Sequence, residues 1–536
     1  MKLTLGPPGP FLTVMLRRGH TPSRRRPDLS GDPGMPLSPL KLRFLVISLL
    51  TVSFLGALDN TVVSTALATV AGQLGALEQM SWIVVGYTLA STVLLPVLGK
   101  LGDIVGPRAV FLISLVVFIL SSLGCGFAPS MGWLIFARVV QGMSSAGLQL
   151  MSQTIIALTT TPRQRPQYMA IIGAAFPIAI LVGPVIGGLI TDYWSWPWVF
   201  WVNAPVGIIA LVLAAVAVPH IEGVGSSRFD VAGAATLGVA VVALVLAVTW
   251  VVDREQLAAA LIAFAVTAAC LAAFILVELR AADPIVPLRH LANRTIGAGI
   301  VISAIVGIGL FSITSYLPTY FQMAYRTSAT VSGLVPIATV FGMLVSNLIS
   351  GWLASRTGHY RVFPIAGTIL GAAGLAVMAV LPVGLPLWVP MVVMAIVGLG
   401  TGAFMSLIVT VVQSAAPVGE TGAVTATVNL VRQVGATVAT ALIGGVIGFA
   451  VAAGLPAGLD AATLTPTTVH AASPAVQVQI AALYRDVFAP IFIALAATYL
   501  VGVIASLLLP PGRLSDESPD LPAATEPRHP VRSARS

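Results

Sequence analysis

The stretch that decides the fold runs from residue 173 to residue 207 and reads GAAFPIAILVGPVIGGLITDYWSWPWVFWVNAPVG. Its first part is an apolar run that four glycines and two prolines interrupt. A soluble helix would end at such residues, but a membrane helix tolerates them because small residues let neighbouring helices approach closely. The second part carries four tryptophans, a residue enriched at membrane interfaces. The stretch therefore predicts a deformable membrane helix, a short outer loop and the next helix.

The whole chain is too apolar for a soluble protein. Its 536 residues are 57% hydrophobic and 9% charged, and the mean hydropathy is +0.98. A soluble core cannot hide that much apolar surface, and continuous apolar runs argue against a β-barrel. We therefore expect an all-α polytopic membrane protein surrounded by a lipid bilayer. Both cysteines, Cys125 and Cys270, lie in apolar runs and are expected to be packing residues.

Fourteen apolar runs are long enough to cross a bilayer, which takes ~20 residues in a helix. We place them at 44–67, 81–99, 109–128, 133–158, 168–191, 198–219, 231–252, 257–279, 296–318, 331–354, 362–382, 387–410, 423–452 and 487–509.

The positive charges predict the orientation of these spans. Most of the 27 Lys and Arg residues lie in the two terminal tails or in the loops on the same side. Because cytoplasmic loops are enriched in Lys and Arg, both termini are expected in the cytoplasm. The net charge of +8 is then a topology signal, not a sign of nucleic-acid binding. The preference for Arg over Lys suggests a bacterial genome, so we expect the bacterial plasma (inner) membrane.

An internal repeat predicts how the spans are grouped. Residues 99–108 (GKLGDIVGPR) close the second span, and residues 351–361 (GWLASRTGHYR) close the tenth. Two six-helix halves would place such copies six spans apart rather than eight, so we expect an inserted pair and a 6 + 2 + 6 arrangement. The expected parts are a disordered cytoplasmic tail at 1–40, an N-terminal half at 41–220, two inserted helices at 221–283, a C-terminal half at 284–510, and a disordered cytoplasmic tail at 511–536. Met35, just before the first span, is a hypothetical true start.

The first copy of the repeat suggests a gate at the cytoplasmic face. Gly99 and Gly106 permit a tight turn, and Asp103 and Arg108 could form a charge latch against neighbouring helix ends. The alternative is a plain polar turn in which the glycines only provide geometry.

Three charged residues fall well inside spans, namely Asp59, Arg138 and Arg432. Burying a charge in a bilayer costs ~3 kcal/mol or more, so each is a functional candidate. Asp59 lies about 24 Å into the first span by helical rise. Apolar surroundings disfavour a carboxylate anion, so such a group can bind and release protons, as proton coupling requires. The alternative is a carboxylate locked permanently to an arginine.

Two polar stripes predict a water-filled cavity. Gln141, Ser145, Gln149 and Ser152 lie on the same face of the fourth span as Arg138. A stripe of that length should face water or polar partners and not lipid; a purely structural hydrogen-bonding role is the alternative.

The second half of the chain supplies the other cavity candidates. Arg432 repeats the Arg-centred polar face on the thirteenth span, together with Asn429. The ninth span and its exit add Tyr316, Tyr320 and Gln322, which could bind flat, hydrophobic or cationic ligands. The alternative for these aromatics is an interfacial belt.

Some chemistries are excluded. The chain has no GxxxxGK[ST], HExxH or GxSxG motif, so we expect no enzyme, no ATP-driven pump, no metal and no cofactor besides a proton gradient.

Seven segments carry a resemblance to a known family. They are Leu58–Val63, Gly99–Arg108, Arg138–Gly142, Gly183–Gly188, Trp196–Gly207, Leu317–Gln322 and Asn429–Gly435. Together they resemble the fourteen-helix drug:proton antiporter family of the major facilitator superfamily over residues 44–509. The resemblance implies a major-facilitator-type fold and a role for Arg138 in proton coupling. We expect Asp59 to exchange protons with the outside and Arg138 to respond to its charge state across the cavity. The resemblance also implies an exporter motif in the fifth helix, formed by Gly183, Pro184, Gly187 and Gly188.

We therefore expect a proton-coupled exporter that works by alternating access, with the two six-helix halves rocking about a central site. The substrates that the resemblance implies are hydrophobic or cationic drugs, and the protein is expected to act as a monomer. Two alternatives stay open: an exporter of an endogenous metabolite or lipid, and a non-transporting receptor or scaffold. A scaffold has no need of a wet, charged cavity, which argues against the second.

Overall fold

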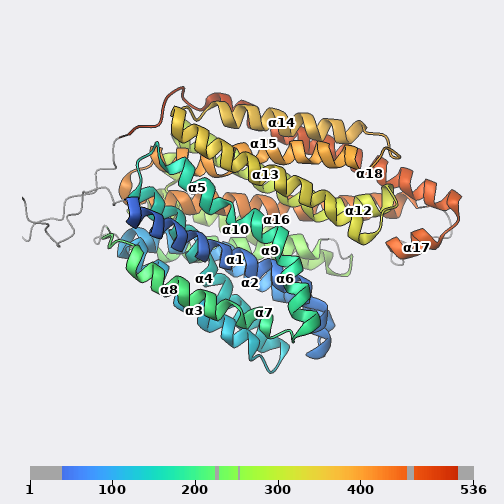
Figure 1. Ribbon diagram of the computed structural model, residues 1–536, viewed down its shortest axis with the longest axis horizontal. Coiled ribbons are helices and arrows are strands. Elements are labelled where there is room, and N and C mark those ends of the chain that lie inside the picture. Colours follow the sequence, from blue (N-terminus) through green and yellow to red (C-terminus); the bar gives the residue numbers. More distant parts are fainter. Residues whose placement is uncertain (1–38, 224–227, 252–253, 456–463, 517–536) are drawn as a thin grey trace, which may run out of the picture. The chain divides into compact units, whose positions relative to one another are not determined.

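The computed structural model describes residues 39–223, 228–251, 254–455 and 464–516. The predicted start at Met35 and most of both predicted tails lie outside these residues. The described helices form one compact unit within Leu37–Asp520 and run side by side (Figure 1).

The helices occupy the predicted spans and generally extend beyond them. The first half holds α1 (Pro39–Gln73), α2 (Met80–Val105), α3 (Pro107–Gly126), α4 (Met131–Thr159), α5 (Arg165–Gly173), α6 (Ala175–Tyr193), α7 (Trp198–Trp201) and α8 (Asn203–Ala217). The middle pair is α9 (Val231–Trp250) and α10 (Leu257–Arg280). The second half holds α11 (Arg294–Val306), a π-helical turn (Gly307–Phe311), α12 (Ser312–Ala324), α13 (Ala329–Thr357), α14 (Val362–Val380), α15 (Trp388–Ala415), α16 (Thr421–Gly454), α17 (Pro466–Ala471) and α18 (Pro474–Leu508).

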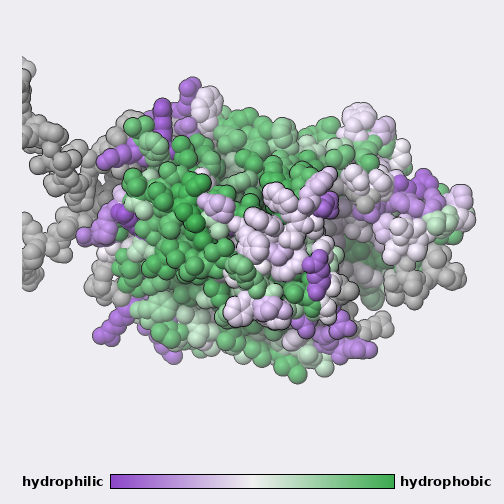
Figure 2. Space-filling model, turned by 60° about the horizontal axis from the view of Figure 1, so that its bottom comes forward, coloured by the Kyte–Doolittle hydropathy of each residue, from purple (hydrophilic) through white to green (hydrophobic). Residues whose placement is uncertain are grey.

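Thirteen helical segments among the described residues are long and apolar enough to cross a membrane. Of the fourteen predicted spans, the fourth, α4, is not among them, and α4 carries the polar stripe predicted for that span. Figure 2 shows apolar residues over a broad area of one face, with hydrophilic residues gathered mainly towards its ends. Large exposed apolar side chains such as Phe136, Val216 and Leu261 account for such a surface, which suits a bilayer.

The stretch that opened the sequence forms the predicted helix, loop and helix. The helix is interrupted once, at Ala174, between α5 and α6, and the loop of residues 194–197 leads to α7 and α8. Trp194 and Trp198 are exposed, as an interfacial belt requires, whereas Trp196 is buried edge-on against Phe200. The tryptophan cluster is therefore partly an interface anchor and partly a packing element.

The two halves pack on each other in a reciprocal way. The second span of the first half, α2, packs against α16, which is the fifth of the last six. The fifth span of the first half, α5–α6, packs against α13, which is the second of the last six. The helices α9 and α10 pack on each other, and α9 also contacts α2 and α16. Reciprocal packing is what two related halves would produce, and the 6 + 2 + 6 division itself stays a prediction.

The ends of the helices fall into two groups because successive spans alternate in direction. We call the end at which α1 begins and α2 ends the basic end, because Lys100, Arg108, Arg163, Arg356 and Arg361 lie there. We predict that it faces the cytoplasm.

Candidate functional site

A cavity of about 860 Å³ lies between the two halves. It is lined by residues of α1, α2, α4, α5 and α6 from the first half, α9 from the middle pair, and α12, α15 and α16 from the second half. Its lining extends to Thr249, next to the last residue of α9 at the end opposite the basic one. The volume is within the range of sites that hold drug-sized molecules.

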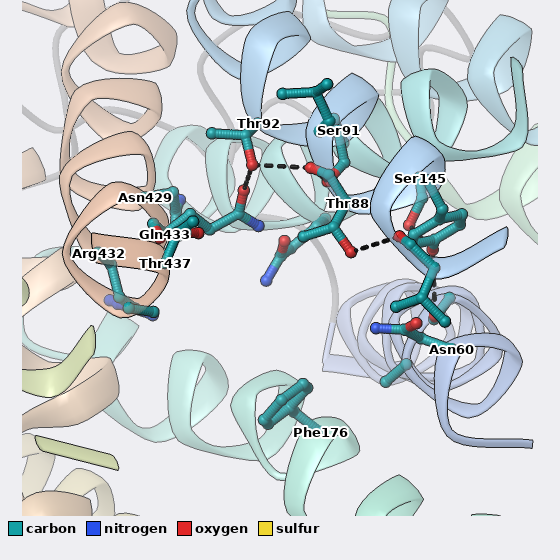
Figure 3. Close-up of a pocket in the computed structure, with 18 of the residues that line it drawn as sticks. Asn60, Thr88, Ser91, Thr92, Ser145, Phe176, Asn429, Arg432, Gln433 and Thr437 are labelled. Carbon is teal, nitrogen blue, oxygen red and sulfur yellow. Dashed lines mark hydrogen bonds between the residues drawn. The ribbon is translucent and has the colours of Figure 1, made fainter. Parts of the chain in front are cut away.

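Polar side chains connect the halves across the cavity. Thr92 of α2 donates to Gln433 of α16 at 2.6 Å, and Asn429 of α16 donates to Gln153 of α4 at 2.8 Å. Figure 3 shows Thr92 and Gln433 joined in this way, with Thr88 and Ser145 close by on the first-half side. These bonds can be exchanged for water or ligand contacts, so they hold the halves together without locking them.

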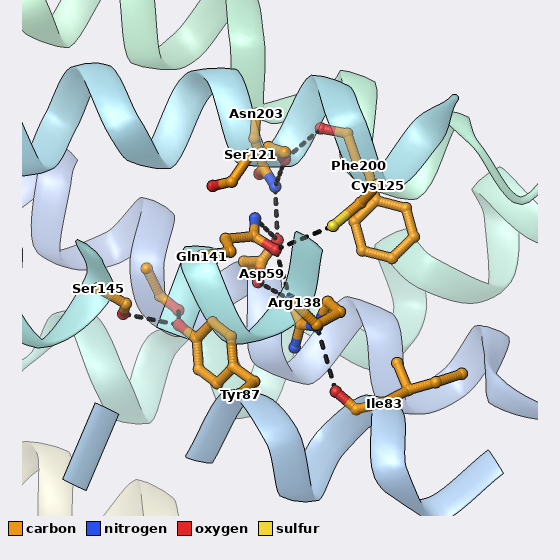
Figure 4. Close-up of polar contacts among 12 residues, drawn as sticks. Asp59, Ile83, Tyr87, Ser121, Cys125, Arg138, Gln141, Ser145, Phe200 and Asn203 are labelled. Carbon is orange, nitrogen blue, oxygen red and sulfur yellow. Dashed lines mark hydrogen bonds and ion pairs between the residues drawn. The ribbon is translucent and has the colours of Figure 1, made fainter. Parts of the chain in front are cut away.

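A buried ion pair lies beside the cavity. Arg138 Nη1 of α4 donates to Asp59 Oδ2 of α1 at 2.5 Å, and both side chains are fully buried. The other carboxylate oxygen, Oδ1, accepts from Asn203 Nδ2 of α8 at 2.6 Å and from Gln141 Nε2 at 3.0 Å. Figure 4 shows these groups converging on Asp59. The charge of Arg138 balances that of the carboxylate, and two amide donors complete its hydrogen bonding, which is what a buried ion pair needs.

The ion pair reaches the cavity through Tyr87. The Tyr87 ring lies 4.2 Å from Arg138 Cζ, and its hydroxyl donates to Ser145 Oγ at 2.6 Å. Tyr87 and Ser145 both line the cavity, whereas Asp59 and Arg138 are not among the lining residues that the structure describes. The cavity and the ion pair therefore share one side chain as their common wall.

Arg432 occupies a different environment. It lines the cavity from α16 and is 7% exposed. Its Nε donates to Ser303 Oγ at 3.3 Å and its Nη2 to the Met405 carbonyl at 3.5 Å. It forms no ion pair with any residue in the described part of the chain.

At the basic end, Asp103 joins the two halves. Its carboxylate accepts hydrogen bonds from the backbone N–H groups of Gly422 and Ala423, both at 2.8 Å. These groups belong to the first turn of α16, where unpaired N–H groups and the helix dipole favour a negative charge. Gly99 makes the contact possible, since a Cβ there would lie 2.6 Å from the Ala426 Cβ.

Arg108 binds a helix end within the first half. Its Nη2 donates to the carbonyl of Ala215, in the last turn of α8, at 2.8 Å. Asp103 on α2 and Arg108 on α3 thus each bind the end of a neighbouring helix, and their action as a latch stays a prediction. Gly106 has a φ of 100°, a backbone conformation that favours glycine.

Arg163 and Arg165 add contacts between the halves at the same end. Arg163 donates to the carbonyls of Ser355 and Arg356 and pairs with Asp516 at 2.6 Å. Arg165 Nη1 donates to Ser414 Oγ of α15 at 3.2 Å. With Asp103, these contacts hold the halves together at the basic end.

The glycines of α6 bring that helix close to α1. A Cβ at Gly183 would lie 2.1 Å from Thr61 Oγ1, and one at Gly187 would lie 2.2 Å from Thr65 Oγ1. Thr61 and Thr65 lie on the helix that carries Asp59. Gly188, by contrast, faces open space, and Pro184 lies inside α6. Two of the predicted motif residues thus set the α1–α6 contact.

Several sequence predictions need correction. Gln141 belongs to the Asp59 network and Ser152 bonds to the Leu148 carbonyl, so neither is among the cavity-lining residues. Tyr320 is 1% exposed because it packs against Phe488 and Phe492.

Gln322 is half-buried and is likewise not among the residues that line the cavity. The cavity candidates that do line it are Ser145, Gln149, Tyr316, Asn429 and Arg432. Arg138, expected to sense Asp59 across the cavity, instead contacts it directly.

Sequence reasoning missed three members of the network around Asp59. Asn203 donates to Asp59 and to Ser122 Oγ, and Tyr87 covers Arg138. The sequence could have indicated Asn203 as a candidate, because it is an amide at the start of an otherwise apolar helix. Ser122 and Tyr87 had none, since their partners lie on other helices.

Known proteins with similar sequences are transporters. The family model of the Major Facilitator Superfamily matches residues 49–440. Multidrug transporter protein MdtP of Bacillus subtilis is 33% identical over 412 residues, which are 76% of this chain and 75% of the relative. An uncharacterized MFS-type transporter of Mycobacterium tuberculosis is 31% identical over 501 residues, which are 91% of this chain and 73% of the relative.

A solved structure shares the fold. The crystal structure of the human organic anion transporter MFSD10 covers 88% of this chain and 100% of its own, with a TM-score of 0.58 at 15% sequence identity. The chain therefore belongs to the major facilitator superfamily of membrane transporters, and its relatives include multidrug transporters.

Proposed function

We propose that this protein is a proton-coupled exporter of hydrophobic drugs that works by alternating access. It would act as a monomer in a bacterial plasma membrane with both termini in the cytoplasm, and a proton gradient would be its only energy source. The sequence relationship to multidrug transporters supports the substrate class. The observation that carries the coupling is the buried Asp59–Arg138 pair, which touches the cavity wall through Tyr87.

Protonation of Asp59 would change the cavity wall in a defined way. A neutral carboxyl group no longer holds the guanidinium of Arg138, which must then find other acceptors. Arg138 Nη2 is a buried donor without a hydrogen-bond partner among the described residues, so the site is already incompletely bonded. Movement of Arg138 would reach Tyr87, which lies against its guanidinium, and through Tyr87 would reach Ser145 at the cavity.

The contacts at the basic end supply the two-state element that alternating access requires. Asp103, Arg163 and Arg165 hold the halves together there, while the cavity extends towards the opposite end. In the other state these contacts would break and the cavity would open to the basic end. The bonds Thr92–Gln433 and Asn429–Gln153 are weak enough to exchange during that motion.

The test is uphill export of the uncharged dye Nile red by purified protein in liposomes with an imposed pH gradient. Wild type is expected to export the dye and to lose this activity when a protonophore is added. Asp59→Asn should lose gradient-driven export. Because it leaves Arg138 buried without its counter-ion and should lower stability, export is compared per amount of folded, monodisperse protein recovered in the liposomes. The matched control is Asp192→Asn, the same change at an exposed carboxylate, which should leave export unchanged.

Two outcomes would contradict the proposal. Gradient-driven export by Asp59→Asn would show that Asp59 is not the coupling group. Export by wild type that persists with the protonophore would remove proton coupling altogether.

A further inference from the structure

We propose that the cavity selects amphipathic organic acids, with Arg432 binding the acid group and the apolar walls binding the rest. This inference rests on the proposed export function and names the substrate class of the same cavity. It departs from the hydrophobic or cationic drugs that the family resemblance implied, because it adds an acid group to the hydrophobic ligand and disfavours cationic ones.

The charge of the cavity is the first argument. Among the described residues that line it, Arg432 is the one charged side chain, and none of the others is Asp, Glu, Lys or His. A cation inside the cavity would meet a positive charge and no carboxylate. An anion would meet a guanidinium already stripped of most of its water, where the attraction is poorly screened.

The bonding of Arg432 is the second argument. A guanidinium carries five N–H donors and prefers planar acceptors that bind two of them together, such as a carboxylate. Here its contacts are the Ser303 hydroxyl at 3.3 Å and the Met405 carbonyl at 3.5 Å, both neutral and both long. In Figure 3 its side chain leaves α16 beside the open space that Phe176 borders. The residue is therefore a buried cation without a counter-ion in the described structure.

The position of Asp59 is the third argument. The buried carboxylate that could attract a cation is held by Arg138, Gln141 and Asn203, and it does not line the cavity. The pair is neutral as a whole, so it leaves the field of Arg432 uncompensated.

The remaining walls suit the apolar part of such a ligand. Phe176 and Tyr316 supply aromatic faces, and Met169 and Met405 supply flexible apolar surface. A volume of about 860 Å³ leaves room for a body of several rings. The site thus combines one anchoring charge with an adaptable apolar chamber.

The test uses three fluorescent probes that share one body: anthracene-9-carboxylate, its uncharged primary amide, and (anthracen-9-ylmethyl)trimethylammonium. Binding of each is measured with purified protein in nanodiscs. Wild type is expected to bind the carboxylate about tenfold or more tightly than the amide, since a hydrogen bond to a charged group contributes at least that factor. The trimethylammonium probe should bind most weakly.

Three variants and one control separate the charge of Arg432 from its packing. Arg432→Gln should lose the preference for the carboxylate while still binding the amide, and Arg432→Lys should keep a reduced preference. Gln433→Glu adds a carboxylate to the cavity, can still accept from Thr92, and should also lose the preference. Arg289→Gln removes an exposed arginine elsewhere and should behave as wild type.

The inference is overturned if wild type binds the three probes equally or prefers the cation. It is also overturned if the preference for the carboxylate survives in Gln433→Glu, whatever Arg432→Gln does. If Arg432→Gln no longer binds the uncharged amide probe either, the substitution has damaged the cavity. The result for Gln433→Glu then decides whether the inference holds. Nile red export without a carboxylate preference removes only this inference, whereas failure of both Nile red export and probe binding removes the proposed function too.

Discussion

Two buried arginines, Arg138 and Arg432, lie well inside the described spans, and they differ in almost every respect except burial. Arg138 is bonded to Asp59 and lies behind the cavity wall. Arg432 lies on the cavity wall and has no acidic partner in the described residues. In the sequence, both arginines stand in the same pattern, one arginine within a polar stripe of a membrane span.

The difference shows how a membrane protein can assign different tasks to the same side chain. A paired arginine is a neutral unit that changes only when its carboxylate gains a proton, so it suits coupling. An unpaired arginine attracts anions continuously, so it suits binding. The two predicted functions therefore depend on the partner and not on the residue type.

The largest expected effect is the loss of stability when the ion pair is broken from one side. Arg138→Met should lower the free energy of unfolding by about 3–5 kcal/mol, because it leaves the Asp59 charge buried and uncompensated. The double variant Asp59→Asn/Arg138→Met should recover much of that loss. Thermal unfolding of the purified variants in one detergent measures both. A double variant no more stable than Arg138→Met would mean that packing, not charge, is responsible.

The second largest effect is expected on the contact between the halves that Asp103 makes with backbone N–H groups of α16. Asp103→Asn should weaken the contact by about 1 kcal/mol, because it removes the charge that favours a helix N-terminus. Since the contact joins the two halves, the population open at the basic end should rise several-fold.

That opening is measurable as a distance between spin labels. Gln164 in the first half and Thr357 in the second are exposed at the basic end and can carry labels in a cysteine-free background. Asp103→Asn should add a longer distance to the distribution. An unchanged distribution would show that Asp103 does not hold the closed state.

A smaller effect is expected for Arg432. The substitution Arg432→Met, matched to the one at Arg138, should change the free energy of unfolding by no more than about 1 kcal/mol, and an increase is the expected direction. It removes a buried cation that has only neutral partners. Thermal unfolding of Arg432→Met and Arg138→Met, measured under the same conditions, gives the comparison. A loss as large as that of Arg138→Met would show that the two arginines do not differ as described.

The smallest effect is expected for Arg108. Its hydrogen bond to Ala215 is exposed and stays within the first half. Arg108→Gln should therefore cost less than about 0.5 kcal/mol. It should also leave the Gln164–Thr357 label distance unchanged. A shift like that of Asp103→Asn would mean that both charges act as one latch.

Much of the architecture was predictable from local sequence. Apolar runs of membrane-spanning length specify helices because an unbonded backbone is very costly in a bilayer, whatever the rest of the chain does. The glycines at 183 and 187 indicated a close helix contact, and Gly106 indicated a tight turn. The acid Asp59 and the base Arg138 stood out because charges inside spans are rare.

The identity of each partner was decided only by the tertiary structure. The sequence placed Asp59 and Arg138 79 residues apart and could not tell a direct contact from two groups across a cavity. Gln141 and Ser145 lie one helical turn apart on α4. Because different helices pack on each side of α4, Gln141 belongs to the ion-pair network and Ser145 lines the cavity. Tyr320 does not line the cavity because it packs against Phe488 and Phe492, which follow it in the chain by more than a hundred residues.

By itself, then, the sequence determined the membrane-helix fold, the family resemblance and the list of costly buried charges, because these depend on composition and on spacing along one helix. The tertiary structure alone decided which charge is neutralised and which is free for a ligand. The physical reason is that the strength of a buried charge depends on the groups within a few ångströms of it, and those come from helices distant in the chain.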